Sequence, residues 1–162
     1  MKQVGFYGGF LILEIGPAAD MRLFFDCVRF GMKDLPNGTD GGLLTDRLYR
    51  RYLRLEELDP AAALVGQVRE ILKNIRTKTV DWSGFKPDQS ELDRSLPNLG
   101  ALFAPYLDGA LTVISDARRF HKEFNSYKPV ITIITSAPRF YVEKQRPLAE
   151  YDALEGEPMW LR

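Results

Sequence analysis

Hydrophobic positions along the chain follow two periods, and each period predicts a different kind of element. Residues 4–15 (VGFYGGFLILEI) are rich in aromatic and β-branched types and carry few charges, which predicts a single strand. Gly8 and Gly9 within this strand indicate a bulge or a close backbone approach. Residues 130–135 (VITIIT) are the most strand-like run after it, and residues 140–142 indicate a further short strand.

Two helices are predicted in the first third of the chain. Gly16 and Pro17 end the first strand, and Pro17 suits the first turn of a helix. The buried stripe of that helix is predicted, from apolar residues at helical spacing, to be Met21, Phe24, Phe25, Val28 and Met32. After a turn cluster at 35–42, the run LLTDRLYRRYLRL predicts a short helix with these residues inward: Leu43, Leu44, Leu48 and Tyr52.

Two longer helices carry the clearest amphipathic pattern. The first is predicted from Asp59, as N-cap, to about Ile75. Its expected buried face is Leu64, Val65, Val68, Ile71, Leu72 and Ile75. The second is predicted from about Leu107, and its expected buried face is Ala110, Val113, Ile114, Ala117, Phe120 and Phe124.

The stretch KTVDWSGFKPD, residues 78–88, follows the first of these helices and contains one of the two tryptophans. Thr77, Thr79 and Val80 alternate as in a strand, which places Val80 and Trp82 on one face and Asp81 on the other. Trp82 is therefore expected to be largely buried. We therefore expect any contact with a partner to be made by Asp81 and the polar connection after it, which extends to residue 98.

These elements predict one α+β domain in which a small, mainly antiparallel sheet packs against two long helices and a shorter one. The 162 residues suffice for a single domain with a sizeable core. Residues 1–135 are expected to form this α+β domain. Residues 136–162 form a proline-containing C-terminal extension, which is expected to pack on the same domain.

Composition and charge exclude several classes of protein. The 22 Lys and Arg residues balance 22 Asp and Glu residues, which disfavours a strongly basic nucleic-acid binder. Cys27, the single cysteine, lies in the apolar run FFDCVRF and is expected to be a buried hydrophobe, so no disulfide framework is predicted. No segment resembles a signal peptide or a membrane span, and a cytoplasmic location is expected.

No enzyme motif emerges from the residues that carry chemistry. His121 is the single histidine and has no companions at metal-ligand spacing, so no metal site is expected. Nucleophile-elbow, P-loop and dinucleotide-binding glycine patterns are absent. Carboxylates cluster at 56–59, 88–93 and 152–157, which leaves a hydrolase as one hypothesis. Glycosidase-type hydrolysis, however, needs two carboxylates held across a cleft, and proximity in sequence does not provide this. We therefore predict no catalytic residues and no cofactor.

The densest basic set allows two interpretations. Arg47, Arg50, Arg51 and Arg54 occupy one face of the predicted short helix, with tyrosines between them. Arginine next to tyrosine engages phosphates and stacked bases, which makes a small nucleic-acid-binding module the alternative hypothesis. The acidic neighbours Asp46, Glu56, Glu57 and Asp59 favour instead a solvated, salt-bridged face.

The order of these features resembles a bacterial family. The features, in order, begin with the aromatic, glycine-containing strand ending in EIG, the helix FFDCVRF, and the segment LLTDRLYRRYLRLEEL. They continue with the helix ALVGQVREILKNI, which leads to VDW, and end with LFAPYLDGALTVISDA before the strand VITII. Over residues 4–135 this order resembles the immunity proteins of polymorphic-toxin and contact-dependent inhibition systems, and is most similar to the immunity protein 70 family.

This resemblance implies a cytoplasmic protein that neutralises a toxin. The partner is the C-terminal toxin domain of a contact-dependent inhibition effector, often a nuclease, and neutralisation works by covering its active site or substrate surface. No membrane partner and no direct nucleic-acid contact are expected. Because nucleases are basic, the expected contact surface is acidic with aromatic anchors. The candidate toxin-binding residues are Asp81, Phe85, Asp88, Glu91, Asp93 and Tyr106, with Trp82 as a further anchor if its ring is exposed.

Overall fold

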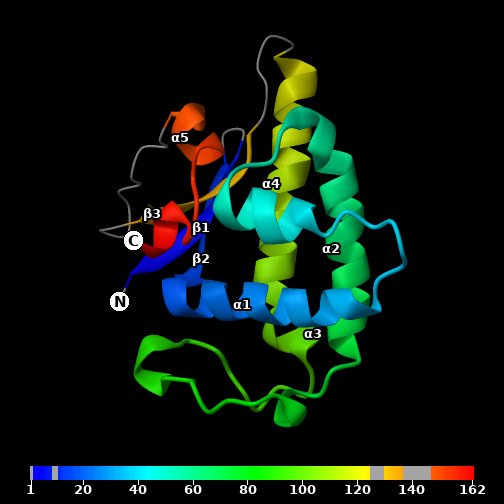
Figure 1. Ribbon diagram of the computed structural model, residues 1–162, viewed down its shortest axis with the longest axis vertical. Coiled ribbons are helices and arrows are strands. Elements are labelled where there is room, and N and C mark those ends of the chain that lie inside the picture. The colour runs from blue at the N-terminus through cyan, green and yellow to red at the C-terminus, as the bar shows by residue number, and fades with distance from the viewer. Residues whose placement is uncertain (1, 9–10, 125–129, 137–146) are drawn as a thin grey trace.

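A computed structural model describes residues 2–8, 11–124, 130–136 and 147–162 and shows the expected α+β fold (Figure 1). Its sheet has three strands, β1 (Gln3–Gly8), β2 (Leu11–Pro17) and β3 (Thr132–Ser136), in the order β2-β1-β3. Both pairings are antiparallel. The predicted strand at 130–135 is thus confirmed, whereas the predicted strand at 140–142 falls outside the described residues.

The prediction of one strand over residues 4–15 is wrong, because the chain reverses direction between Gly8 and Leu11 and forms two paired strands. The irregularity in this pairing lies between Val4 and Gly5 rather than at Gly8. A Cβ atom at Gly5 would overlap the carbonyl oxygen of Leu13 on β2. Gly5 therefore allows the two backbones to approach closely at the bulge.

The helices are α1 (Ala18–Gly31), α2 (Leu58–Lys73), α3 (Leu99–Leu102), α4 (Ala104–Glu123) and α5 (Leu148–Asp152). In Figure 1, α2 and α4 run side by side and α1 crosses them. Helix α4 also packs on the sheet, where a Cβ at Gly109 would lie 2.5 Å from Cδ1 of Ile15 on β2. The sheet and α4 are therefore in close contact because this helix position has no side chain.

The predicted helix faces largely match the core. Four residues in each of the three long helices are buried as expected: Met21, Phe24, Phe25, Val28, Leu64, Val65, Val68, Leu72, Ala110, Val113, Ile114 and Ala117. Cys27 is also buried, as predicted. Phe124 is 50% exposed, so its assignment to the buried face is wrong, because α4 ends at Glu123, beyond the sheet and α2.

Helix boundaries differ from the prediction by a few residues. Helix α2 begins at Leu58 with Glu57 as its N-cap, not with Asp59. Helix α4 begins at Ala104, with a proline in its first turn, and so earlier than the predicted Leu107. The short helix at Leu43–Leu48 is a π-helix, and its predicted inward residues are buried. Tyr52 is buried too, although it follows the helix.

The strand predicted around Thr77–Trp82 does not form. Residues Thr77–Thr79 make a 3-10 turn, in which both the backbone N–H and the Oγ1 hydroxyl of Thr79 donate to the carbonyl of Arg76, at 3.0 and 2.7 Å. Such local hydrogen bonds replace the ladder of a strand. A bridge between Arg76 and Asn98 brings the ends of the following segment together, and we call residues 77–97 the 77–97 loop.

The C-terminal residues 147–162 pack on the same domain as the rest of the chain. Tyr151, Leu154 and Trp160 are buried, and the indole N–H of Trp160 donates to the carbonyl of Tyr49 at 2.7 Å. The boundary expected after residue 135 falls inside β3. None of the helices in the described ranges combines the length and apolar character needed to cross a membrane.

Candidate functional site

The main candidate site is a groove of about 370 Å³ between α1 and the 77–97 loop. Figure 1 shows this loop passing beneath α1. The α1 side of the groove includes Asp20, Leu23 and Asp26, and the loop side includes Asp81, Trp82 and Phe85. We call it the α1–loop groove. It brings together two segments that are about sixty positions apart in the sequence.

Two aromatic rings form the loop wall of the groove. Trp82 and Phe85 meet edge to face with their ring centroids 5.6 Å apart. The indole N–H of Trp82 donates to the carbonyl of Thr77 at 2.9 Å, and the backbone N–H of Phe85 donates to the carbonyl of Trp82 at 2.9 Å. These bonds fix both rings within the loop. Trp82 is half-buried rather than largely buried, because the strand that was expected to carry it inward is absent.

Asp20 ties the loop to α1. It lies in the first turn of the helix, where a negative charge interacts favourably with the helix dipole. The residue is only 1% exposed, and its Oδ2 accepts a 2.8 Å hydrogen bond from the backbone N–H of Glu91. This bond anchors the loop beside the groove.

Asp81 contributes the exposed negative charge of the groove. Its Oδ1 accepts a 3.0 Å hydrogen bond from the backbone N–H of Ser83. Hydrogen bonds from the Ser83 backbone and side chain lower the pKa of Asp81. Asp81 is therefore ionised at neutral pH and suits attraction of a cation rather than general acid catalysis.

Other charges in the lining are partly compensated. Arg29 donates to Asp26 at 3.1 Å, and the Arg22 guanidinium lies 3.6 Å from Glu157 in the C-terminal segment. Lys86 also lines the groove. Three aspartates against two basic residues leave this lining with one net negative charge (−3 + 2 = −1).

The structure separates the six predicted toxin-binding residues into three groups: two that line the groove, three that are exposed elsewhere on the loop, and one that is buried in the core. Asp81 and Phe85 line the groove. Asp88, Glu91 and Asp93 lie exposed elsewhere on the same loop. In Asp93, hydrogen bonds from the Ser95 side chain and backbone lower the pKa of the carboxyl group.

Tyr106 is the one candidate that must be corrected. It is only 4% exposed, because its ring packs against Phe24 and Phe103 in the core, and burial raises the pKa of its hydroxyl. It is therefore not available as a surface anchor. Asp20 was missed, because a lone acidic residue at the start of a helix gives no sign in the sequence of the loop that will cover it.

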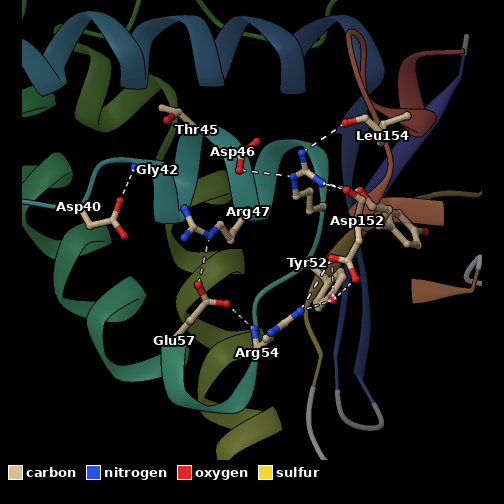
Figure 2. Close-up of polar contacts among 12 residues, drawn as sticks. Asp40, Gly42, Thr45, Asp46, Arg47, Tyr52, Arg54, Glu57, Asp152 and Leu154 are labelled. Atoms are coloured by element: carbon tan, nitrogen blue, oxygen red, sulfur yellow. Dashed lines mark hydrogen bonds and ion pairs between the residues drawn. The ribbon is translucent and has the colours of Figure 1, made fainter. Parts of the chain in front are cut away.

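Three arginines of this set, Arg47, Arg51 and Arg54, line a second hollow of about 330 Å³. Figure 2 shows the polar contacts around it. Here Arg47 lies 3.3 Å from Glu57, and Arg54 lies 3.8 Å from Asp152. The hydroxyl of Tyr52 is 2.9 Å from Oδ1 of Asp152 and accepts a 2.9 Å hydrogen bond from Arg54. The hollow is thus lined by a network of opposite charges.

Arg51 contacts the C-terminal segment instead of solvent. Its guanidinium donates to the backbone carbonyls of Tyr151, Asp152 and Leu154 at 2.9, 2.5 and 3.3 Å, and it lies 3.4 Å from Asp46. Three of the four arginines are therefore engaged by the chain itself. This pattern favours the salt-bridged interpretation of the arginine face, while nucleic-acid binding there stays a prediction.

Within the described ranges, no three His, Cys, Asp or Glu side chains are grouped closely enough to hold a metal ion. Comparison with known proteins gives no further constraint: no family model, curated protein or solved structure matches the chain.

Proposed function

We propose that this protein is an immunity protein that binds a cognate toxin domain and neutralises it by covering its active site or substrate surface. The proposed contact surface is the α1–loop groove with the exposed acidic residues of the 77–97 loop around it. The observation that carries the proposal is the aromatic pair Trp82 and Phe85, which is held partly exposed beside the carboxylates of Asp20 and Asp81. The order of features in the sequence supports the same class.

Several properties of this surface suit a protein partner. Aromatic side chains in a partly enclosed centre are typical anchors of binding energy, and surrounding charges accelerate association and select the partner. The loop is closed at its base by the Arg76–Asn98 bridge and fixed to α1 by the Asp20–Glu91 hydrogen bond. A surface held in this way loses less conformational entropy on binding.

Co-purification tests this function. The proposed function predicts that a neighbouring gene encodes a large secreted protein ending in a toxin domain, and the chain is expressed with that domain. We expect a complex at micromolar concentration and loss of the toxin's activity. Failure to form a complex with that domain contradicts the proposed function.

A matched pair of variants then locates the surface. Phe85→Ala removes an aromatic anchor from the groove and is expected to weaken toxin binding about tenfold or more. Phe30→Ala removes another phenylalanine, which is 56% exposed and does not line the groove, and is expected to leave binding unchanged. Equal losses in both variants would place the contact surface elsewhere.

A further inference from the structure

We infer that the α1–loop groove is a receptor for an arginine side chain, with the guanidinium placed between the carboxylates of Asp20 and Asp81 and the rings of Trp82 and Phe85. The inference rests on the proposed function in that the arginine belongs to the surface of the toxin domain. The chemistry of the groove can nevertheless be tested without the toxin.

The carboxylate of Asp20 is the first reason. Asp20 lines the groove although it is only 1% exposed. Of its two oxygens, Oδ2 accepts from the Glu91 backbone, and no other hydrogen bond reaches this carboxylate from the described parts of the chain. A carboxylate has several acceptor positions, so Oδ1 is left to accept from a cationic donor that enters from the groove.

The aromatic wall is the second reason. The two rings already bind one guanidinium, because Arg94 lies 4.2 Å from the centroid of Phe85 and 5.7 Å from that of Trp82. Arg94 is not part of the groove lining. The rings therefore have the geometry for cation–π contact and also border a cavity that the chain leaves open.

The groove favours arginine over lysine. A planar guanidinium stacks on aromatic rings and offers a fork of N–H donors to carboxylates, whereas an ammonium acts as a strongly hydrated point charge. The volume of about 370 Å³ lies in the range of ligand pockets. Lys86 lines the same groove and competes electrostatically with an incoming cation.

The binding test uses the full chain and N-acetyl-arginine amide as the probe, titrated at low salt and followed by the indole N–H signal of Trp82 in nuclear magnetic resonance spectra. We expect a saturable shift of this signal, weakened by salt. N-acetyl-lysine amide should bind more weakly, and the neutral N-acetyl-glutamine amide should cause no saturable shift. An equal response to all three probes, or none to the arginine probe up to about 100 mM, overturns the inference.

Variants give the decisive comparison. Asp81→Asn changes an exposed residue and should raise the apparent Kd of the arginine probe about tenfold, as expected for loss of a hydrogen bond to a charged group. Asp34→Asn, an exposed aspartate at the opposite end of α1, is the matched control and should leave the Kd unchanged. Lys86→Gln should lower the Kd. An unchanged Kd in Asp81→Asn contradicts the assigned site.

The two proposals fail in different ways. If the probe binds but no toxin complex forms, the groove is an arginine receptor for another partner and the proposed function is wrong. If the toxin complex forms but the probe does not bind, the function stands and the groove assignment is wrong.

Discussion

Asp20 shows how one side chain can determine the position of a long loop. It lies in the first turn of α1, yet its hydrogen bond reaches the backbone of Glu91. A carboxylate at this position accepts a backbone N–H and interacts favourably with the helix dipole. The same residue therefore fixes the loop and contributes to the lining of the groove.

Cys27 makes stability depend on pH. Burial, and to a lesser degree the charge of Asp26, raises the pKa of its thiol from 9.0 to about 12. Because the folded state holds this proton more tightly than the unfolded state, the contribution of Cys27 to stability is complete below about pH 9 and is lost as the pH rises toward 12. We predict that the free energy of unfolding decreases above about pH 9, by at most about 1.4 kcal/mol per pH unit from this group.

Urea unfolding at several pH values measures this decrease. In Cys27→Ala the additional loss of stability with pH should disappear, even though removal of the sulfur lowers stability at neutral pH. Tyr106→Phe serves as the comparison, because burial also raises the pKa of the Tyr106 hydroxyl. An identical pH dependence in wild type and Cys27→Ala would contradict the role of the thiol.

At the scale of elements, helix α5 is held by contacts from residues 49–52. The Arg51 guanidinium donates to the carbonyl of Asp152 at the C-terminal end of α5 and to that of Leu154 just after the helix. The Tyr52 and Tyr151 rings meet edge to face with centroids 6.2 Å apart. A guanidinium near a helix C-terminus satisfies carbonyls that have no partner within the helix. A helix of five residues is too short to be stable alone, so its formation depends on these contacts.

We predict that Arg51→Lys lowers the free energy of unfolding by about 1–3 kcal/mol, because the single nitrogen of an ammonium cannot replace Nη1 and Nη2, which reach the three carbonyls, and Nε, which lies near Asp46. Arg119→Lys is the matched control. Its arginine forms an i,i+3 pair with Asp116 and is 71% exposed, so the expected change is below about 0.5 kcal/mol. Equal losses in the two variants would show that the carbonyl contacts of Arg51 contribute little.

The sequence predicted the helices better than the connections between them. Helix α2 follows directly from the spacing of Leu64, Val68 and Leu72, because burial of one face is a periodic requirement. The reversal after Gly8 and the 3-10 turn at Thr77 were missed. At Thr77–Thr79 a few local hydrogen bonds decide the conformation. The composition of residues 4–15 is typical of strands and does not distinguish one long strand from two paired strands.

At the scale of the whole molecule, one hydrophobic core connects the sheet, the helices α1 to α4 and the chain around Trp160. It includes Phe6 on β1, Leu72 on α2, Leu107 on α4 and Trp160 near the C-terminus. Trp82 packs against this core from the 77–97 loop. A continuous core of this size favours unfolding in one cooperative step.

We predict that both tryptophans report the same unfolding transition. Trp82→Phe leaves Trp160 as the probe of the C-terminal segment, and Trp160→Phe leaves Trp82 as the probe of the loop. In each variant, the midpoint of urea unfolding from fluorescence should equal the midpoint from far-ultraviolet circular dichroism. An earlier fluorescence transition in Trp160→Phe would show that the 77–97 loop opens separately.

The candidate site was only half predictable. Asp81 and Phe85 stood out because acidic and aromatic residues occur together in a polar segment. Their neighbours Asp20 and Leu23 come from a helix whose pattern shows a buried face but not which loop crosses it. Tyr106 was misassigned because aromatic residues at the start of a helix have the same appearance in sequence whether they point inward or outward.

The position of β1 in the middle of the sheet has a consequence for biosynthesis. About 125 residues are translated between β1 and its neighbour β3. At typical translation rates of about 5–20 residues per second, one edge of β1 waits on the order of ten seconds for its partner. A nascent chain is therefore exposed to mispairing during this interval, and the native sheet can be completed only after β3 has been made.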